Sequence, residues 1–527
     1  MKAGMNETSR MIRAGVLVGL MLGCAAAADV GCASAHPSGA GAATSSSGGD
    51  DGGAGRGDGG PAPSCIPSKS TFAVADACGV FVSSSKGSDT MGDGSKQEPY
   101  ATLTKALAEA DGQPVYACGE SFTETVWLPE SATLYGGLDC TKGWAYDAST
   151  KTQLTTTADA IPLSISTATT SAEVFDFAIT SANASQPGGS SIAVLVARAA
   201  SSFTRCDLTA GDGKVGAAGA PYPKAAPAGK PGLPGADACT APGPLGAISV
   251  LTPCGSDFSA SGPGGYGQPT AGGNGDNGQP GTALDGGQGE GSMVCPAGTM
   301  GDDGDTIAPA MPGTGATGFG TFTVSGYAGV PGGQGGAGSP GQGGGGGGGA
   351  KGGNGNGMCA SAASAGGASG GSGGSGGCGG VGGHGGGAGG SSIALASIDA
   401  TLSFAGVTLK TGNGGKGGDG GAGQAGGMGS PGGPGGKAKS IYSNLNDACS
   451  GGPGGDGGSG AMGGGGLGGH SLGIAFTGKA PPKVGWTATA GSAGGGGMGD
   501  DTNGNVGDGT DGQAQECWDF DSGVACK

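Results

Sequence analysis

Two stretches decide the fold, SSIAVLVARAASSFTRCDLTAG (Ser190–Gly211) and SSIALASIDATLSFAGVTLKTG (Ser391–Gly412), and they are copies of one motif. The offset between them is 201 residues without a gap, and nine of the 22 aligned positions are identical. A weaker third copy, HSLGIAFTGKAPPKVGWTATAG, spans His470–Gly491. Units that bury an apolar face only against a neighbouring unit are typical of solenoids, so the repeat predicts a solenoid.

The repeat extends upstream of the first copy at a shorter offset, which places Val174 against Phe203. Its apolar positions then form columns that recur from unit to unit: Val174, Phe203 and Phe404; Phe177, Cys206 and Val407; Ile179, Leu208 and Leu409. These columns predict short strands that stack in register with the aligned side chains in the core. The alternative interpretation is chance similarity among strand segments rich in alanine and serine.

Glycine is concentrated in the second half of the chain, which has 135 Gly and 30 Pro in total. In 61–210 glycine is as frequent as in an average protein, about 7%, whereas in 211–527 it makes up roughly a third of the sequence. This composition excludes a compact helical protein and a membrane-spanning bundle. Each later copy of the motif runs into glycine at the same point, so the insertions at 212–390, 413–469 and 492–516 are predicted to leave one corner of the solenoid.

The glycine tracts have a period of three residues. From Gly414 to Lys437 every third residue is glycine for eight triplets, and similar runs span 367–387 and 451–471. Collagen needs much proline between its glycines, and proline is sparse here. The period matches a polyproline II helix, and glycine on two of its three faces would let such helices pack backbone to backbone. The tracts resemble the Gly-x-x bundles of some antifreeze and fibre-tip proteins, and their composition resembles the glycine-rich surface proteins called PGRS. A flexible, disordered loop is the alternative.

The segment between Cys78 and Cys140 sets the start of the fold. Short strands are predicted at 79–84, 114–118, 122–128 and 132–138, and a helix from Pro99 to Gly112 with apolar residues at i, i+3, i+4 and i+7. A strand, a GSDTMGDGS loop, a PYATLTKAL helix and further short strands resemble the start of the right-handed parallel β-helix domains of the pectin-lyase-like group. That resemblance implies an all-β fold: a right-handed parallel β-helix whose first coil is capped by one N-terminal helix, with long glycine-rich loops inserted at one corner.

The N-terminus is predicted to be an export signal. Basic residues precede the apolar run Ala14–Leu22, which is too short to span a bilayer. The run Met21–Cys24 resembles the lipobox of bacterial lipoproteins, which implies lipid modification of Cys24, a membrane anchor and, because Ala25 follows, the outer membrane. Cleavage after one of the nearby alanines by ordinary signal peptidase is the alternative. Residues 33–64 have the composition of a flexible linker.

The cysteine count supports export. There are 15 Cys; with Cys24 lipidated, the other 14 could all pair, and a secreted chain tolerates so many thiols only as disulfides. The close pairs are expected to bond first: Cys65 with Cys78, Cys118 with Cys140, and Cys517 with Cys526. Spacing leaves the remaining connectivity open, although Cys359, Cys378 and Cys449 in or beside the tracts are suited to cross-link a bundle.

Few residues offer chemistry. His36 and His384 lie in low-complexity sequence, and His470 is expected to be a solvated corner residue. Enzymes of the resembled fold use clustered Asp, or Lys or Arg with calcium; the nearest candidates are Asp176, Arg205 and Asp207, for which an exposed ion pair between adjacent coils is the other explanation.

A calcium loop is a second, weaker candidate. Asp501, Asn503 and Asn505 space oxygen ligands as extracellular calcium loops do, but a solvated acidic turn is the alternative. No other cofactor is expected. The net charge of −17 repels phosphate backbones, so nucleic acid is not expected as a partner.

The sequence therefore predicts a non-enzymatic, surface-exposed lipoprotein with a structural or adhesive role, whose partners are the membrane and an extracellular polysaccharide or other surface. A polysaccharide lyase or glycosidase on a β-helix and a glycan- or ice-binding polyglycine bundle are the alternatives. The expected organisation is a signal peptide (1–23), a lipid-anchored linker (24–64), the first part of the β-helix (65–211), a glycine-rich insertion (212–390), a coil (391–412), a second insertion (413–469), a coil (470–491) and a Gly/Asp-rich C-terminal segment with a Cys pair (492–527).

Overall fold

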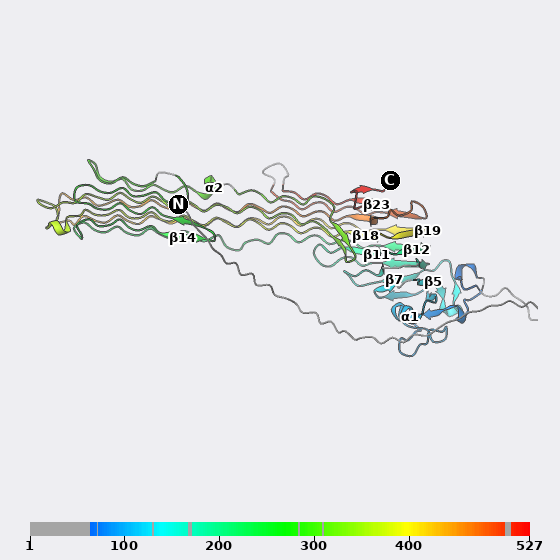
Figure 1. The fold of residues 1–527 in the computed structure, drawn as a ribbon. Coiled ribbons are helices and arrows are strands. Elements are labelled where there is room, and N and C mark those ends of the chain that lie inside the picture. Colours follow the sequence, from blue (N-terminus) through cyan, green and yellow to red (C-terminus); the bar gives the residue numbers. More distant parts are fainter. Residues whose placement is uncertain are drawn as a thin grey trace, which may run out of the picture. The chain divides into compact units, whose positions relative to one another are not determined.

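The computed structural model describes residues 64–70, 72–128, 131–166, 171–282, 285–307, 310–500 and 507–526. Most of the strands in this part of the chain pair in parallel and belong to three sheets (Figure 1). The predicted all-β class is therefore confirmed. Among the described residues, no helix has the length and apolar character needed to cross a membrane.

The three sheets are built from short strands. Sheet A contains β1 (Val80–Val82), β2 (Val115–Cys118), β5 (Thr133–Asp139), β9 (Ser171–Phe175), β12 (Ala200–Thr204) and β19 (Thr401–Ala405), with β6 (Ala145–Tyr146) antiparallel to β5. Sheet B contains β3 (Ser121–Thr123), β7 (Thr152–Thr155), β10 (Phe177–Thr180), β13 (Asp207–Thr209), β20 (Val407–Lys410) and β22 (Trp486–Thr489). Sheet C contains β4 (Val126–Leu128), β8 (Leu163–Ser166), β11 (Ser191–Ala197), β18 (Ser392–Ile398), β21 (Ser471–Thr477), β23 (Ala514–Asp519) and the antiparallel β24 (Val524–Ala525).

The chain passes through sheets C, A and B in turn, and each such passage is called a coil below. The strand registers equal the offsets of the sequence repeat. Phe203 pairs with Val174 of the preceding coil and with Phe404 of the following one, and Val407 pairs with Trp486 of the coil after that. The predicted columns therefore stack in register, and the buried side chains at these positions form one core. Beyond the predicted last coil, β23 adds a further strand to sheet C, so the C-terminal segment is partly sheet.

Two corners of every later coil require a left-handed backbone. Between sheets A and B this position is taken by Asp176 (φ 60°), Arg205 (φ 54°), Gly406 (φ 66°) and Gly485 (φ 87°), which follow the repeat offsets. Between sheets C and A it is taken by Arg198, Asp399 and Gly478. A non-glycine residue in this conformation costs about 1–2 kcal/mol, so these corners carry strain at 176, 198, 205 and 399 that glycine removes at 406, 478 and 485.

Helix α1 (Leu103–Glu109) packs against β1, β2 and β4 and adds its apolar face to the core. It begins at Leu103 and not at Pro99, so the predicted start was too early. The backbone N–H of Tyr100 donates to the Phe81 carbonyl oxygen, which keeps this part of the chain extended. Thr102 is the N-cap, since its side chain accepts the N–H of Lys105. The predicted strand at 122–128 is also wrong: it is divided into β3 and β4, which belong to different sheets.

The glycine-rich insertions leave the stack between sheet B and sheet C, as predicted. Each begins after a sheet B strand (β13, β20, β22) and ends before a sheet C strand (β18, β21, β23). Their extended stretches, called legs here, are leg 1 (212–238), leg 2 (330–352), leg 3 (366–390), leg 4 (413–437), leg 5 (448–469) and leg 6 (492–500). Figure 1 shows them running alongside one another from the strands.

The legs are joined by backbone hydrogen bonds at every third residue. The N–H groups of 332, 335, 338 and so on to 350 in leg 2 donate to the carbonyls of 386, 383, 380 and so on to 368 in leg 3, so these legs are antiparallel. Leg 3 in turn donates to leg 5 in a constant register, from Gly371 and Cys449 to Gly389 and Leu467. The next bond of the same series, Ser392 to His470, is already part of sheet C. The tracts are therefore a hydrogen-bonded bundle that continues the strand stacking, and the flexible-loop alternative is not what the structure shows.

Shorter elements complete the described chain. Two hairpins lie within the first insertion, β14 (Leu251–Cys254) with β15 (Asp257–Ala260) and β16 (Thr321–Thr323) with β17 (Gly326–Ala328). The remaining helices are α2 (Gly304–Ile307) and the 3-10 turns η1 (Pro67–Lys69), η2 (Asp76–Cys78), η3 (Cys140–Lys142) and η4 (Ala362–Ser364).

Candidate functional site

The candidate enzymatic residues are engaged in ion pairs. Arg205 binds Asp176 with both ends of its guanidinium group, Nε to Oδ1 and Nη2 to Oδ2, at 2.7 Å each. The hydroxyl of Tyr146 donates to the same carboxylate at 3.0 Å, and the Arg205 guanidinium lies 5.9 Å from the Tyr146 ring centre. The Asp176 bonds raise the pKa of Arg205 above its usual value, so the guanidinium group stays charged.

Asp207 belongs to a separate pair, because its carboxylate lies 2.7 Å from the Lys151 ammonium. The structure thus brings Asp176 and Arg205 together as predicted, but with the carboxylate side chain only 6% exposed. A bidentate pair of this kind fixes two neighbouring coils at a strained corner. The arrangement supports the ion-pair explanation for these residues.

His470 is buried, so the prediction of a solvated corner residue was wrong. Its Nε2 atom lies 2.8 Å from the Phe319 carbonyl oxygen, and its Nδ1 atom accepts the N–H of Gln513 at 2.9 Å. Burial lowers the pKa of His470, which favours the neutral ring that these two contacts require. The residue therefore fastens the first insertion to the start of β21. His384, in leg 3, stacks on Tyr222 of leg 1.

Six disulfides are present in the described chain. The three close pairs, Cys65–Cys78, Cys118–Cys140 and Cys517–Cys526, are the predicted ones. Three bonds are long-range, at separations of 120, 124 and 154 residues: Cys239–Cys359 and Cys254–Cys378 lie within the first insertion, and Cys295–Cys449 joins that insertion to leg 5. These disulfides are consistent with an exported protein that folds in an oxidising environment.

Cys206 is an exception to the expectation that all cysteines after Cys24 could pair. It is a buried free thiol within the core, and burial raises its pKa to about 12. Its column partners Phe177 and Val407 explain the position, since a thiol there behaves as a small apolar side chain. It has no reactive character.

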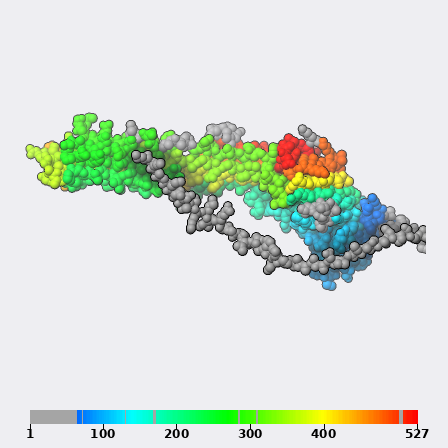
Figure 2. Space-filling view, viewed as in Figure 1, coloured from blue at the N-terminus to red at the C-terminus, as the bar shows by residue number. Residues whose placement is uncertain are grey.

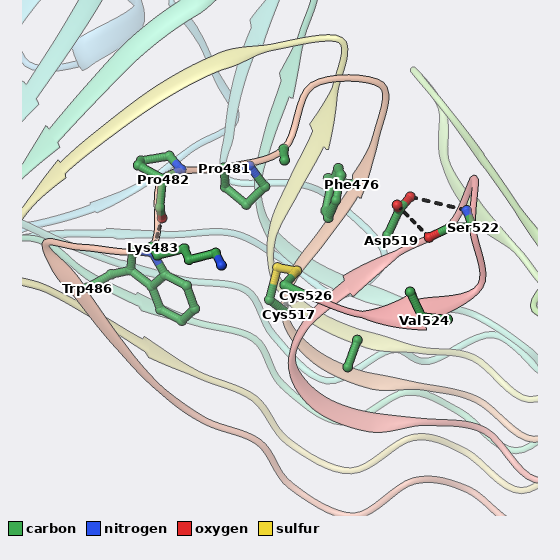
Figure 3. Close-up of a pocket in the computed structure, with 12 residues that line it drawn as sticks. Phe476, Pro481, Pro482, Lys483, Trp486, Cys517, Asp519, Ser522, Val524 and Cys526 are labelled. Atoms are coloured by element: carbon green, nitrogen blue, oxygen red, sulfur yellow. Dashed lines mark hydrogen bonds between the residues drawn. A yellow bond between two sulfur atoms is a disulfide. The ribbon is translucent and has the colours of Figure 1, made fainter.

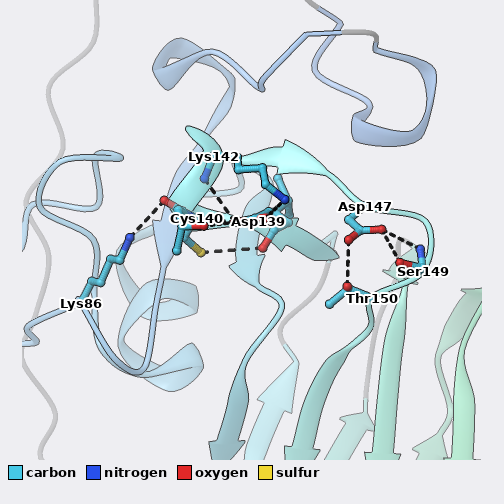
Figure 4. A network of polar contacts seen from close by, with 9 residues as sticks. Lys86, Asp139, Cys140, Lys142, Asp147, Ser149 and Thr150 are labelled. Carbon is cyan, nitrogen blue, oxygen red and sulfur yellow. Dashed lines mark hydrogen bonds and ion pairs between the residues drawn. The ribbon is translucent and has the colours of Figure 1, made fainter.

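A polar network stabilises the first coils (Figure 4). The Lys86 ammonium donates to the Cys140 carbonyl oxygen at 3.2 Å, and Lys142 pairs with Asp139 at 2.9 Å. Bonds from Thr141 and Lys142 hold the pKa of Asp139 well below its usual range. Cys118, Glu120 and Cys140 lie close enough to hold a metal ion, but both thiols are consumed by their disulfide, so these residues brace the fold.

The outer side of leg 4 is the candidate binding surface. Its third-position residues are Asn413, Lys416, Asp419, Ala422, Ala425, Met428, Pro431, Pro434 and Lys437, and all except the half-buried Asp419 are exposed. These residues, called the outward row, recur about every 9 Å if each residue rises ~3.1 Å as in a polyproline II helix. The two intervening positions face neighbouring legs: a Cβ added at Gly426 or Gly427 would overlap the carbonyl oxygen of Gly457 or Pro227.

Leg 1 widens this surface. Its backbone N–H groups at Gly229, Gly232 and Gly235 donate to Met428, Pro431 and Pro434 of the outward row. Exposed apolar residues of leg 1 lie beside and between these contacts: Pro227, Ala228, Pro231, Leu233 and Pro234. The result is a mostly apolar surface on adjacent legs, with Met428 71% exposed and Leu233 41% exposed, which also carries the exposed Lys230. Sequence reasoning missed it, because the pairing of legs 1 and 4 is not visible in either leg alone.

The lipidation candidate Cys24 and the calcium candidates Asp501, Asn503 and Asn505 lie outside the described residues. Comparison of this chain with protein-family models, with curated proteins and with solved structures finds no match.

Proposed function

We propose that this chain is an exported, non-enzymatic surface lipoprotein that uses an ordered glycine-rich bundle to contact an extended partner surface. In this proposal the three sheets are a right-handed parallel β-helix capped by α1, and the legs are polyproline II helices. Cys24 carries the lipid that anchors the protein to the outer membrane. An extracellular polysaccharide is the proposed partner.

The observation that carries the proposal is the enclosure of the run Gly343–Gly349. Residues 341–350 are all buried. Within the run, backbone N–H groups donate to three segments, at 273–279, 296–299 and 371–374. Its carbonyl oxygens accept from three others, at 262–265, 287–290 and 449–452. This run of leg 2 is thus hydrogen-bonded to six backbone segments and is packed on all sides. A bundle packed in this way holds its surface residues in fixed positions.

The rigidity of the glycine-rich bundle favours a role in binding over a role as a flexible tether. A flexible glycine chain would lose its conformational entropy on binding, at about 1–2 kcal/mol per residue fixed. In the bundle that entropy is already lost on folding. Two disulfides brace the first insertion internally and a third ties it to leg 5. The outward row and leg 1 therefore offer a pre-organised apolar surface, which reduces the entropy that association must overcome.

A sedimentation assay with insoluble extracellular polysaccharide from the producing cells tests the proposal. Met428→Asp places a charge at the centre of the apolar surface and leaves the packing glycines intact, so we expect bound protein to fall at least about tenfold. Met311→Asp is the matched control, because Met311 is 77% exposed and lies beside leg 2. Equal binding by the two variants and the unchanged protein would contradict a role for this surface.

The anchor is tested separately. Cys24→Ser removes the nucleophile for lipid attachment, so the protein is expected to leave the membrane fraction and appear in the soluble exported fraction. Retention in the membrane fraction would contradict the lipid anchor without bearing on the bundle surface.

A further inference from the structure

A pocket of about 410 Å³ opens at the last coil, next to the final strands of sheets B and C (Figure 3). Three segments form its walls: the end of β21, residues 480–486 leading into β22, and the β23–β24 hairpin. Figure 2 shows the C-terminal residues, in red and orange, at the surface of this region. The pocket is separate from the apolar surface on legs 1 and 4.

The walls of the pocket are mostly apolar and partly aromatic. They include Phe476, Pro481, Pro482 and Trp486, and the disulfide Cys517–Cys526 lines the side opposite the prolines. The indole Nε1–H of Trp486 donates to the Pro482 carbonyl oxygen at 2.7 Å. This bond satisfies the polar edge of the ring and fixes its orientation, so the site for a flat ligand exists before binding.

The charges at the rim are unequal. Asp519 accepts hydrogen bonds from the N–H of Asp521 at 2.9 Å and from the hydroxyl of Ser522 at 2.6 Å, so its charge is already stabilised. The Lys483 ammonium, in contrast, has neither a hydrogen bond nor an ion pair with any residue in the described part of the chain. Figure 3 shows the Lys483 side chain on the Trp486 side of the pocket and Asp519 on the far side.

We propose that this pocket binds a small aromatic carboxylate, with the ring against Trp486 and the carboxylate toward Lys483. A ring stacks on a fixed indole in an offset or edge-on geometry, which the apolar walls also favour. The volume is ample for one or two rings, since a dry cavity of about 150 Å³ holds benzene. Repulsion by Asp519, on the side of the pocket away from Lys483, sets the orientation, because it directs the ligand's negative charge toward Lys483.

Titration calorimetry on the whole exported protein tests the proposal with 2-naphthoate and its neutral analogue 2-naphthalenemethanol. We expect 2-naphthoate to bind more tightly, by about threefold, which is the range of one exposed charge pair. Lys483→Gln should remove that difference and leave binding of the alcohol unchanged. Trp486→Ala should weaken both probes by at least about tenfold.

The matched control is Lys479→Gln, which makes the same charge change on the same loop. The Lys479 ammonium donates to the Thr401 hydroxyl at 3.0 Å, and the residue does not line the pocket. Equal affinities for the two probes, or the same loss with Lys479→Gln as with Lys483→Gln, would overturn the carboxylate assignment. Absence of binding by both probes at about 1 mM would overturn the ligand class altogether. Because Lys483 is exposed, its variant folds and keeps the test decisive even if Trp486→Ala lowers stability.

Discussion

Gly346, in the middle of the run Gly343–Gly349, is the position where one added methyl group tests the bundle most directly. A Cβ at this residue would overlap the carbonyl of Pro263 and lie 2.9 Å from the backbone nitrogen of Gly264. These atoms all belong to the backbone, so the overlap cannot be relieved by a change of side-chain rotamer. Gly346→Ala must therefore push leg 2 away from the segment 262–265.

The size of the effect follows from the contacts. Inserting a methyl group into a packed interior costs about 1–3 kcal/mol. Separation also weakens the two hydrogen bonds that join these segments, Gly262 N–H to the Gly344 carbonyl and Gly265 N–H to the Gly347 carbonyl, each worth about 1 kcal/mol. The lower entropy of the unfolded alanine chain returns about 0.4–1 kcal/mol. The expected loss in the free energy of unfolding of the bundle is therefore about 2–4 kcal/mol.

Thermal unfolding and native-state hydrogen exchange measure this loss. The control is Gly495→Ala: Gly495 is exposed, and a Cβ there meets only the Asp511 carboxylate, at 3.7 Å. This substitution should be neutral or stabilising by up to about 1 kcal/mol. Amides of leg 2 should exchange faster in Gly346→Ala, and their exchange rates should be unchanged in Gly495→Ala. Equal effects of the two substitutions would refute the enclosure of the glycine run.

Three further predictions follow from corners, cross-links and a buried carboxyl. Arg198→Gly should raise the free energy of unfolding by about 1 kcal/mol relative to Arg198→Ala, because Arg198 has φ 51° and glycine relieves that conformation; denaturant unfolding of both variants measures it. Reducing Cys239–Cys359, which closes a separation of 120 residues, should lower the free energy of unfolding by about 5 kcal/mol in the chain-entropy description. In the Cys239→Ser, Cys359→Ser double variant, hydrogen exchange should become faster in the legs than in sheets A to C. A uniform loss of exchange protection would contradict this prediction. Burial raises the pKa of Asp285 to about 6, above its unfolded value of 3.8, so the folded form favours the neutral acid and the protein should lose stability as pH rises from about 4 to about 6. Melting temperatures of Asp285→Asn should lack that part of the pH dependence, and parallel curves for the two proteins would exclude it.

The stacking of the strands was predictable from the sequence because the repeat carries it. The constant offsets between its copies align apolar columns, and a slip of a single position would turn every core side chain outward. The registers Val174–Phe203–Phe404 and Val407–Trp486 are therefore forced by the pattern itself. The left-handed corner was also present in the sequence, in the replacement of Asp176 and Arg205 by glycines at 406 and 485, but it is visible only once the columns are known.

Features that depend on distant segments could not be predicted. His470 occupies the position of Ser190 and Ser391 in the repeat, which indicates a polar corner. Its burial arises because residues near β16 and β17, far earlier in the chain, lie over it and supply the Phe319 carbonyl. The disulfides follow the same rule: pairs of cysteines close in sequence, such as Cys517–Cys526, were readable, whereas Cys254–Cys378 depends on how the β14 hairpin lies against leg 3.

The glycine content of each leg reports the number of its faces that are enclosed. Leg 4 leaves one face open, and there its sequence is free to be Lys, Asp, Ala, Met or Pro, while the other two positions are mostly glycine. Leg 3 is enclosed more fully from 366 to 378, and its third positions there are small: the hydroxyls of Ser369, Ser372 and Ser375 accept N–H groups of leg 1. Its larger third-position residues, Val381 and His384, stand where that face is exposed. The run Gly343–Gly349 is enclosed on every face and contains no side chain at all. Scaffold positions and surface positions are thus separated in the sequence, so substitutions in the outward row can change what the bundle contacts without disturbing how it packs. That separation is the property a display surface needs. It also explains the high glycine content: the bundle buries little apolar side chain and is held together by backbone hydrogen bonds, which require the close approach of legs that glycine allows.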